Sequence, residues 1–333
     1  MNLEESGAAI GGNAGRLLLG DRTLPIDAGE TVLEALERAG LDMASGCRAG
    51  TCCKCMLQAQ GPPSDSQRGL RATLKTQGYF LACQARVDGE LRLLGAEAPE
   101  PISAVVELSE AVAPDVQRLL LRPQASLGFR PGQYLDVLHP GGESRSYSIA
   151  SLPSTGLLEL HVRRVPGGLV SGWLHSLKVD DPLKVRGSFG QCFYLPGDLD
   201  RPLLLVGVGT GLAPLLGIAR DALVQGHRGR IQLLHGGLDP SRLYLREELD
   251  SLARSYEQLE VHHVVLKEST GAEHEGPLDK VACELAGSLA TTRVFLCGDP
   301  KIVQTLQRSL FLAGAQSSEI FADPFLPAGP LES

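Results

Sequence analysis

The fold of the first part of this chain is decided by the stretch Cys47-Arg-Ala-Gly-Thr-Cys52-Cys-Lys-Cys55, which a fourth cysteine, Cys83, follows at a distance. A cysteine, four residues, a cysteine, two residues, a cysteine and a distant fourth cysteine form the plant-type ligand pattern of a [2Fe-2S] cluster. Structural zinc sites more often use two matched ligand pairs. We therefore predict that Cys47, Cys52, Cys55 and Cys83 bind a [2Fe-2S] cluster, with a zinc site or a group of buried thiols as the alternatives.

Small residues surround these cysteines, and they are Gly46, Ala49, Gly50 and Thr51. They leave room for backbone N–H groups to approach the sulfur atoms, and such hydrogen bonds stabilise the more negative, reduced cluster. Cys53 is the neighbour of Cys52, so its side chain is expected to diverge from the cluster. A pairing through Cys53 would also break the spacing, and we assign it no ligand role.

The sequence around the cysteines predicts a first domain over residues 1–94. The segment Arg16–Ile26 alternates as a β-hairpin does, and Thr31–Ala39 has the apolar spacing of a short helix that Gly40 ends. The segment Phe80–Leu94 closes the domain, and residues 1–15 are expected to be a loose tail. Residues 95–101 have the composition of a linker.

The rest of the chain predicts two further domains. Between Ile102 and Pro196, short apolar strands alternate with Gly and Pro turns, which indicates a small antiparallel β-barrel over residues 102–197. After Pro202, strands alternate with helices. That order indicates a parallel, doubly wound α/β sheet over residues 198–333, which ends in a C-terminal tail.

The composition excludes some classes of partner. The formal net charge is -8, which disfavours binding to the phosphates of a nucleic acid. No apolar run approaches the roughly 20 residues of a membrane-spanning helix, so we expect no membrane span. The segment Met1–Gly15 contains Glu4 and Glu5 and lacks the apolar core of a signal peptide. We therefore expect a cytoplasmic protein.

Two further motifs suit ligands that carry a pyrophosphate. Arg145-Ser-Tyr147-Ser148 follows Phe129-Arg-Pro-Gly-Gln-Tyr134 in the barrel segment. A guanidinium can neutralise a pyrophosphate, an aromatic ring can pack on a flavin, and a hydroxyl can bond a ring nitrogen. An isolated tetrapeptide of this kind is more often a polar surface strand. The pattern of Leu203–Pro214 predicts a buried strand, a glycine turn and the start of a helix. At such a turn the backbone can come close to a pyrophosphate.

In this order, the motifs resemble the ferredoxin-NADP reductase superfamily, in its oxygenase-reductase branch with an N-terminal plant-type ferredoxin domain. The benzoate dioxygenase and methane monooxygenase reductases are of this type. The resemblance covers residues 16–327, and the order of the motifs is more specific than any one of them. It implies a multidomain chain with a β-grasp [2Fe-2S] ferredoxin domain, an antiparallel β-barrel FAD domain and an α/β parallel-sheet nicotinamide-binding domain.

The resemblance implies a flavin site in the barrel. Arg145 is expected at the FAD pyrophosphate, Tyr147 against the flavin and Ser148 near its N5 atom, with Ser146 between them. Further expected FAD contacts are Gly168, Leu169, Val170 and Ser171 at a helix start, and His161 and Arg163 on the preceding strand. An ordinary capped helix and an exposed strand face are the respective alternatives.

The resemblance also implies a nicotinamide site. The expected contacts are Gly207, Gly209, Thr210, Gly211 and Pro214 at the glycine turn, and Cys297, Gly298 and Asp299 beside the nicotinamide. Cys297 is expected to contact the C4 edge without acting as a nucleophile; a buried core thiol is the alternative. Glu319-Ile-Phe321 matches the Glu-x-aromatic element near the family's C-terminus, where the ring covers the flavin. Phe325 is expected to share that stacking or cover the adenine, and either phenylalanine is otherwise core.

Two residues after the second strand of this domain bear on the choice of nucleotide. Asp239 would favour a ribose hydroxyl, whereas Arg242 can accept a 2′-phosphate. The oxygenase-reductase branch mostly uses NADH. We therefore expect NADH, with NADPH possible.

The resemblance implies an NAD(P)H-dependent oxidoreductase that passes electrons through FAD and the [2Fe-2S] cluster singly to a terminal oxygenase or other electron-accepting protein. Ser148, Cys297, Glu319 and Phe321 are the expected catalytic residues. A deoxysugar dehydrase or a cytochrome P450 is the alternative acceptor. A redox-sensing iron-sulfur module is a reading from a different class, but it would have little need of a nicotinamide site.

Overall fold

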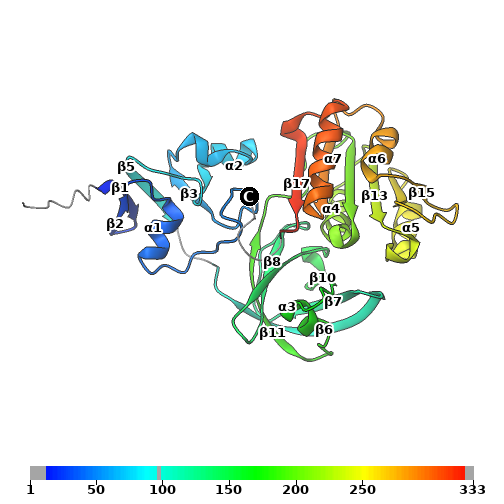
Figure 1. Cartoon of the computed structure of the whole chain (residues 1–333), viewed down its shortest axis with the longest axis horizontal. Helices are drawn as coiled ribbons and strands as arrows, with labels where there is room; N and C mark the ends of the chain where they lie inside the picture. The colour runs from blue at the N-terminus through cyan, green and yellow to red at the C-terminus, as the bar shows by residue number, and fades with distance from the viewer. Residues whose placement is uncertain (1–12, 96–98, 327–333) are drawn as a thin grey trace, which may run out of the picture. The chain divides into compact units, whose positions relative to one another are not determined.

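The computed structural model describes residues 13–95 and 99–326 (Figure 1). The chain divides into two compact units between Pro99 and Glu100, within the segment expected to be a linker. Most of the expected N-terminal tail, residues 96–98 of the linker and residues 327–333 of the C-terminal tail lie outside the described residues. The first strand already begins at Asn13, so the expectation of a loose tail as far as residue 15 is wrong.

The first unit is a mixed β-sheet with one main helix. Its strands are β1 (Asn13–Leu19), β2 (Arg22–Asp27), β3 (Met56–Gln60), β4 (Tyr79–Leu81) and β5 (Gly89–Gly95). Its helical segments are α1 (Val32–Arg38), η1 (Ser64–Gln67) and α2 (Ala72–Thr76). The sheet order is β2-β1-β5-β3-β4, with β1 and β5 parallel, and β1 and β2 form the expected hairpin. Thr31 and Glu34 cap α1 reciprocally, which explains where the helix starts.

The second unit begins with an antiparallel barrel, here called the barrel lobe. Its strands are β6 (Ile102–Ala113), β7 (Val116–Pro123), β8 (Tyr134–Leu138), β9 (Ser144–Ser148), β10 (Leu158–Arg163) and β11 (Pro182–Phe189). It also contains η2 (Pro153–Thr155) and α3 (Leu169–Leu174). The strand order runs from β10 to β9, and a bridge between Ile149 and Leu160 joins these two edges. Closure of the sheet confirms the predicted barrel.

The remainder of the second unit is a parallel sheet, here called the nucleotide lobe. Its strands are β12 (Leu203–Val208), β13 (Ile231–Gly237), β14 (Leu259–Val265), β15 (His274–Glu275), β16 (Arg293–Gly298) and β17 (Ile320–Pro324). Its helices are α4 (Leu212–Val224), α5 (Arg246–Ser255), α6 (Leu278–Ala286) and α7 (Pro300–Leu312). Short helical turns are η3 (Gly209–Gly211), η4 (Pro240–Arg242) and η5 (Ser317–Glu319).

Helices cover both faces of this sheet, as a doubly wound fold requires. Leu205 of β12 packs in one apolar cluster with residues of α4 and α5, whereas Leu204 packs in another with residues of α6 and α7. Successive side chains on a strand point to opposite faces, so the buried run of β12 supplies both clusters. The sheet order β15-β14-β13-β12-β16-β17 places β12 centrally, and the glycine turn follows it. No helix in the described part of the chain is long and apolar enough to cross a bilayer.

Candidate functional site

The four predicted cluster ligands lie in two contacting pairs. Cys47 contacts Cys52, and Cys55 contacts Cys83. The backbone N–H groups of Ala49, Thr51 and Cys52 each lie 3.4 Å from Cys47 Sγ. The contact with Cys52, helped by these N–H groups, lowers the pKa of Cys47 to about 5. The contact with Cys55 likewise lowers the pKa of Cys83 to about 6. The same contacts raise the pKa of the partner thiols Cys52 and Cys55, so one cysteine of each pair gives up its proton readily and the other holds it.

This arrangement fits a two-iron cluster better than a single metal ion. No group of three or more His, Cys, Asp or Glu side chains within residues 13–95 and 99–326 closes around one ion. Two pairs of thiols are what two irons require, because the cluster takes four cysteine thiolates. Gly46 is needed for the fit, since a Cβ there would lie 3.1 Å from Cys52 Sγ.

Cys53 differs from its neighbours in the way that the sequence predicts. Its backbone has φ 55°, and its Sγ lies 3.7 Å from the Thr51 carbonyl oxygen. Its side chain is buried in the apolar core of the first unit. The residue thus serves the packing of the loop, and we assign the cluster to the other four cysteines.

The flavin motif lies on β9 at the end of the barrel sheet. Tyr147 packs against the barrel core, and burial raises its pKa to about 12. The Ser146 hydroxyl donates to Asp136 at 2.8 Å, so this side chain supports the strand. Arg145 is exposed, with its guanidinium 2.6 Å from the Ser144 carbonyl oxygen. An exposed guanidinium beside a half-buried aromatic ring suits a pyrophosphate next to a flavin.

Ser148 contacts Asp323 of the nucleotide lobe, and Asp323 in turn contacts Cys297. Its hydroxyl donates to the carboxylate of Asp323, on β17. The register of β16 and β17 pairs Asp323 with Cys297, and the Asp323 backbone N–H contacts the Cys297 thiol. Burial raises the pKa of Cys297 well above its ordinary value, so the group stays a thiol. Ser148, Cys297 and Asp323 therefore form one site at the junction of the two lobes, and Asp323 was not predicted.

Glu319 and Phe321 lie away from the site formed by Ser148, Cys297 and Asp323, so the structure does not support their expected catalytic role. The Glu319 carboxylate pairs with Arg293 at 2.9 Å and with Arg201 at 3.0 Å, at the other end of β16. Phe321 packs on Phe295, with ring centroids 5.5 Å apart. Glu319, at the end of η5, lies four positions before Asp323, which is about 13 Å along an extended chain.

The correction follows from strand register. The pattern acid-x-aromatic occurs twice, as Glu319-Ile-Phe321 and as Asp323-Pro-Phe325. Only the second reaches the end of β16, where the Phe325 backbone N–H donates to the Gly298 carbonyl oxygen at 2.8 Å. Phe325 is therefore the aromatic residue at this end of the sheet.

The glycine turn is held against the end of β16. A Cβ on Gly211 would lie 2.2 Å from the Cys297 carbonyl oxygen, and one on Gly207 would lie 2.6 Å from a Leu215 methyl. Gly209 has φ 55°, a conformation that glycine adopts without strain. Thr210 and Pro214 are buried beside them. The turn and the start of α4 thus lie against Cys297, and a helix N-terminus suits a dinucleotide pyrophosphate.

Three other predicted contacts have structural tasks. Asp299 accepts from the backbone N–H groups of Lys301 and Ile302 and so caps α7. The Ser171 hydroxyl accepts from the Val165 N–H at 3.1 Å, inside the turn before α3. A Cβ on Gly168 would lie 2.7 Å from that hydroxyl. Leu169 and Val170 are the first two residues of α3, so their backbone N–H groups lie at the N-terminus of that helix. Arg163 is exposed at the end of β10.

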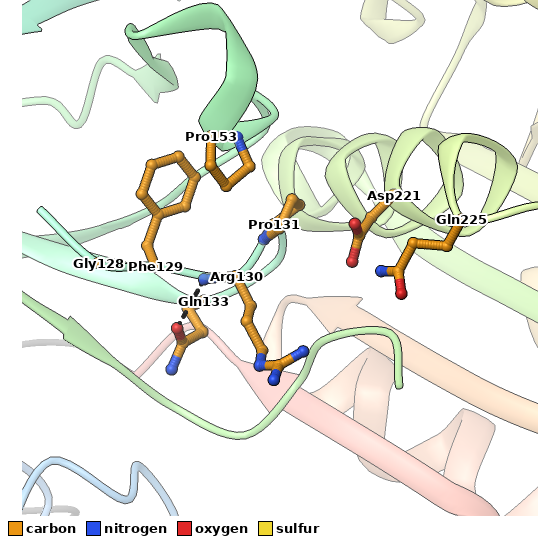
Figure 2. A pocket seen from close by; sticks show the side chains of 8 residues that line it. All are labelled: Gly128, Phe129, Arg130, Pro131, Gln133, Pro153, Asp221 and Gln225. Carbon is orange, nitrogen blue, oxygen red and sulfur yellow. Dashed lines mark hydrogen bonds between the residues drawn. The ribbon is translucent and has the colours of Figure 1, made fainter. Parts of the chain in front are cut away.

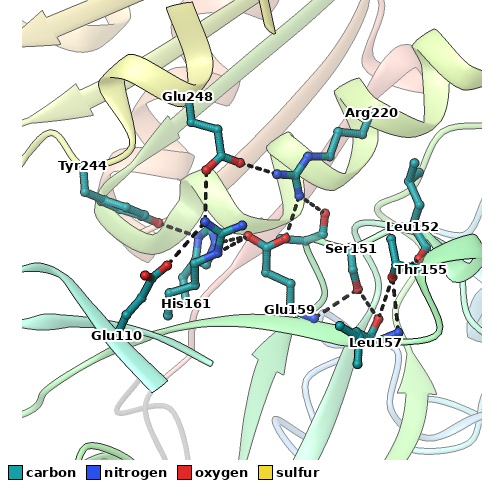
Figure 3. Close-up of polar contacts among 12 residues, drawn as sticks. Glu110, Ser151, Leu152, Thr155, Leu157, Glu159, His161, Arg220, Tyr244 and Glu248 are labelled. Carbon is teal, nitrogen blue, oxygen red and sulfur yellow. Dashed lines mark hydrogen bonds and ion pairs between the residues drawn. The ribbon is translucent and has the colours of Figure 1, made fainter. Parts of the chain in front are cut away.

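His161 lies inside the protein, which does not support its expected contact with FAD. Its side chain is fully buried, with Nδ1 2.9 Å from Tyr244 Oη and Nε2 3.1 Å from Glu159 Oε1 (Figure 3). Both ring nitrogens are thus occupied. Arg220 of α4 pairs with Glu159 at 2.7 Å, so the network joins the barrel lobe to the nucleotide lobe. Burial alone would raise the pKa of Glu159, but the His161 hydrogen bond and the Arg220 charge lower it to about 2.

Replacing Arg220 with methionine is expected to lower the free energy of unfolding of the second unit by about 1–3 kcal/mol, because the buried Glu159 carboxylate then keeps only one of its two arginine partners, Arg118. Arg122→Met is the control, since Arg122 forms an exposed pair with Glu107 whose loss should leave the free energy of unfolding almost unchanged. Urea denaturation followed by circular dichroism measures both. Equal effects of the two substitutions would refute a stabilising role for the buried network.

A pocket of about 450 Å³ lies where the loop before β8 meets α4 (Figure 2). Its lining residues are Gly128, Phe129, Arg130, Pro131, Gln133, Pro153, Asp221 and Gln225. Asp221 lies nine residues after the start of α4, about 14 Å along the helix from the glycine turn. The loop instead supports β9, since Ile149 N–H donates to the Gln133 carbonyl oxygen at 2.8 Å. We assign this pocket no part in hydride transfer.

Three families match successive parts of the chain. Residues 18–88 match the 2Fe-2S iron-sulfur cluster binding domain, residues 103–194 the oxidoreductase FAD-binding domain, and residues 205–308 the oxidoreductase NAD-binding domain. These matches agree with the predicted cofactors, [2Fe-2S], FAD and a nicotinamide nucleotide.

Similar proteins share the whole arrangement. The ferredoxin–NAD(P)+ reductase component of the naphthalene 1,2-dioxygenase system of Pseudomonas putida is 33% identical over 324 residues, covering 93% of this chain and 97% of the relative. The reductase subunit of the aromatic O-demethylase of an Amycolatopsis species is also 33% identical, over 93% of this chain and 98% of the relative. The crystal structure of the Amycolatopsis cytochrome P450 reductase GcoB has a TM-score of 0.72 at 32% identity, and the match covers 94% of this chain and 99% of that one. The chain therefore belongs to the ferredoxin–NAD(P)+ reductase family, in the branch of NAD(P)H oxidoreductases that carry a [2Fe-2S] domain and serve as electron-transfer components.

Proposed function

We propose that this chain is the NADH-dependent reductase component of an oxygenase system. The observation that carries the proposal is the convergence of Ser148, Asp323 and Cys297, from two lobes, beside a glycine turn. When bound, FAD accepts the hydride pair of NADH and releases electrons singly to the [2Fe-2S] cluster. Cys47, Cys52, Cys55 and Cys83 would hold that cluster.

The residues of the site position the reactants rather than exchange many protons. Arg145 would hold the FAD pyrophosphate, Tyr147 would pack on the flavin and the Ser148 hydroxyl would lie near its N5 atom. The buried Cys297 thiol is neutral and would bound the C4 edge of the nicotinamide without attacking it. The Gly209–Gly211 turn would bind the nicotinamide pyrophosphate.

A terminal oxygenase is the proposed electron acceptor. Similar proteins include reductase components of the terephthalate 1,2-dioxygenase of Comamonas and the propane 2-monooxygenase of Gordonia. A cytochrome P450 is the second candidate, because the Amycolatopsis structure is a cytochrome P450 reductase. We place the protein in the cytoplasm, where reducing conditions keep cluster thiols available.

A panel of purified acceptors tests this function. The holoprotein should oxidise NADH and reduce cytochrome c, and one class among Rieske dioxygenases, diiron hydroxylases and cytochromes P450 should saturate the rate at low micromolar concentration. Saturation by a P450 alone would replace the first candidate with the second. A protein whose flavin is not reduced by NADH or NADPH would contradict the proposal as a whole.

Replacing Asp323 with asparagine is expected to slow flavin reduction by NADH about tenfold near pH 8 and to remove its pH dependence. Burial raises the pKa of Asp323 to about 7, against the opposing hydrogen bond from Ser148. Above that pH the carboxylate is ionised and favours the positive charge that develops on the nicotinamide as hydride leaves. Stopped-flow absorbance between about pH 6 and pH 9 measures the effect.

The same substitution has a thermal signature. An unfolded aspartate titrates near 3.8, so between that pH and about 7 the folded chain retains a proton that the unfolded chain has lost. Stability therefore falls as the pH rises through this window, and the asparagine variant escapes that loss. Two pH units below the raised pKa correspond to about 3 kcal/mol, so relative to the wild type the variant should gain roughly 5–10 °C in Tm on going from about pH 5 to about pH 8. A Tm difference that is constant with pH would show that Asp323 titrates normally.

A further inference from the structure

The turn after β13 carries two opposite charges that bear on the choice of nucleotide. In a doubly wound sheet, an acidic residue after the second strand suits the ribose 2′-hydroxyl of NADH, and an arginine suits the 2′-phosphate of NADPH. Here both are on η4, as Asp239 and Arg242. Hydrogen bonds from Ser241 lower the pKa of Asp239, so it is ionised at neutral pH. Because η4 offers an anion and a cation, its own residues leave the preference open.

A third charge reaches this turn from the barrel lobe. Asp115 lies in the turn between β6 and β7, and its Oδ2 is 2.8 Å from Arg242 Nη1. The Arg164 N–H donates to the Asp115 carbonyl oxygen at 2.7 Å, which fixes the backbone of the turn. About half of the Arg242 side chain is exposed (47%), so a nucleotide phosphate can reach the guanidinium, but only in competition with Asp115.

We propose that Asp115 is a specificity-determining residue, which favours NADH by neutralising Arg242. This inference rests on the proposed nicotinamide function. Lys267 also acts on this turn, but it is paired with Glu268 at 3.1 Å. The two carboxylates and one guanidinium therefore leave a net negative charge at the 2′ position, which repels the phosphate dianion of NADPH but not the hydroxyl of NADH. Without Asp115 the net charge is zero, and Arg242 is free to form a charge-assisted hydrogen bond to phosphate.

The test is the isosteric variant Asp115→Asn in the purified holoprotein, with ferricyanide as acceptor. An exposed ion pair is weak, so kcat/KM for NADPH should rise about three- to tenfold while kcat/KM for NADH stays within about twofold. The gain should shrink at high ionic strength, where the charges are screened. The matched control is Glu107→Gln, which breaks an exposed pair with Arg122 inside the barrel lobe, between β6 and β7, and should change neither value.

A second substitution assigns the effect to Arg242. In the double variant D115N/R242A the gain in NADPH use should disappear, because the residue that Asp115 restrains is gone. An unchanged kcat/KM for NADPH in D115N, or the same gain in the double variant, would overturn the inference. Failure of the proposed function would look different, because neither nucleotide would then reduce the flavin even in the wild type.

Discussion

Substituting Cys52 with alanine is expected to lower the rate of cytochrome c reduction at least about a hundredfold. The rate of NADH-dependent ferricyanide reduction should stay within about twofold of the wild-type rate. Loss of one thiolate leaves an iron of the proposed cluster without a ligand, and single electrons then have no route from the flavin to a protein acceptor. Ferricyanide takes electrons from the flavin directly, so it reports on hydride transfer alone. Iron content and the EPR signal of the reduced protein measure the cluster itself.

The adjacent Cys53 supplies a matched control. Its thiol faces the Thr51 carbonyl oxygen and the apolar core, so Cys53→Ala removes one buried sulfur of similar size but no proposed ligand. This variant should keep two irons per chain and cytochrome c activity within about twofold, at a modest cost in stability. If Cys53→Ala lost the cluster and Cys52→Ala kept it, the ligand assignment would be wrong.

The cysteine spacing and the alternation of apolar residues were enough to predict three domains, because both signals are local. Cys47–Cys55 lies in one loop, and the apolar run Leu203–Val206 is continuous because helices cover both faces of its sheet. The helix Thr31–Ala39 was predicted for a similar reason, since its apolar spacing and the Gly40 that ends it lie in one short segment.

The part of the site that depends on distant packing could not be predicted in this way. Glu319 and Asp323 both precede an aromatic residue by two positions, and only the pairing of β17 with β16 places Asp323 beside Cys297. The sequence does contain a second acid-x-aromatic pattern, Asp323-Pro-Phe325, but we assigned a role only to its phenylalanine. His161 shows the same limit, because Tyr244, which buries it, is 83 residues away.

Replacing Gly211 with alanine is expected to lower kcat/KM for NADH by more than about a hundredfold while leaving the bound flavin and the cluster in place. The backbone of Gly211 has φ -59° and ψ -15°, which any residue adopts, so conformational strain is not the cause. The added Cβ would instead lie 2.2 Å from the Cys297 carbonyl oxygen and 2.6 Å from its carbon, and both are backbone atoms that cannot rotate away. The turn must move from β16, and a shift of about 1 Å in a positioning element can cost a hundredfold in rate.

Stopped-flow reduction by NADH measures this loss, and dithionite reduction shows whether the FAD and [2Fe-2S] centres remain. Gly197→Ala is the control, because a Cβ at Gly197 meets no atom within 4 Å. It should match the wild type in both assays. The barrel lobe carries the proposed FAD contacts, so a variant damaged only at Gly211 should keep its flavin absorbance. A Gly211→Ala protein with kcat/KM for NADH within about threefold of the wild type would show that the nicotinamide binds away from this turn.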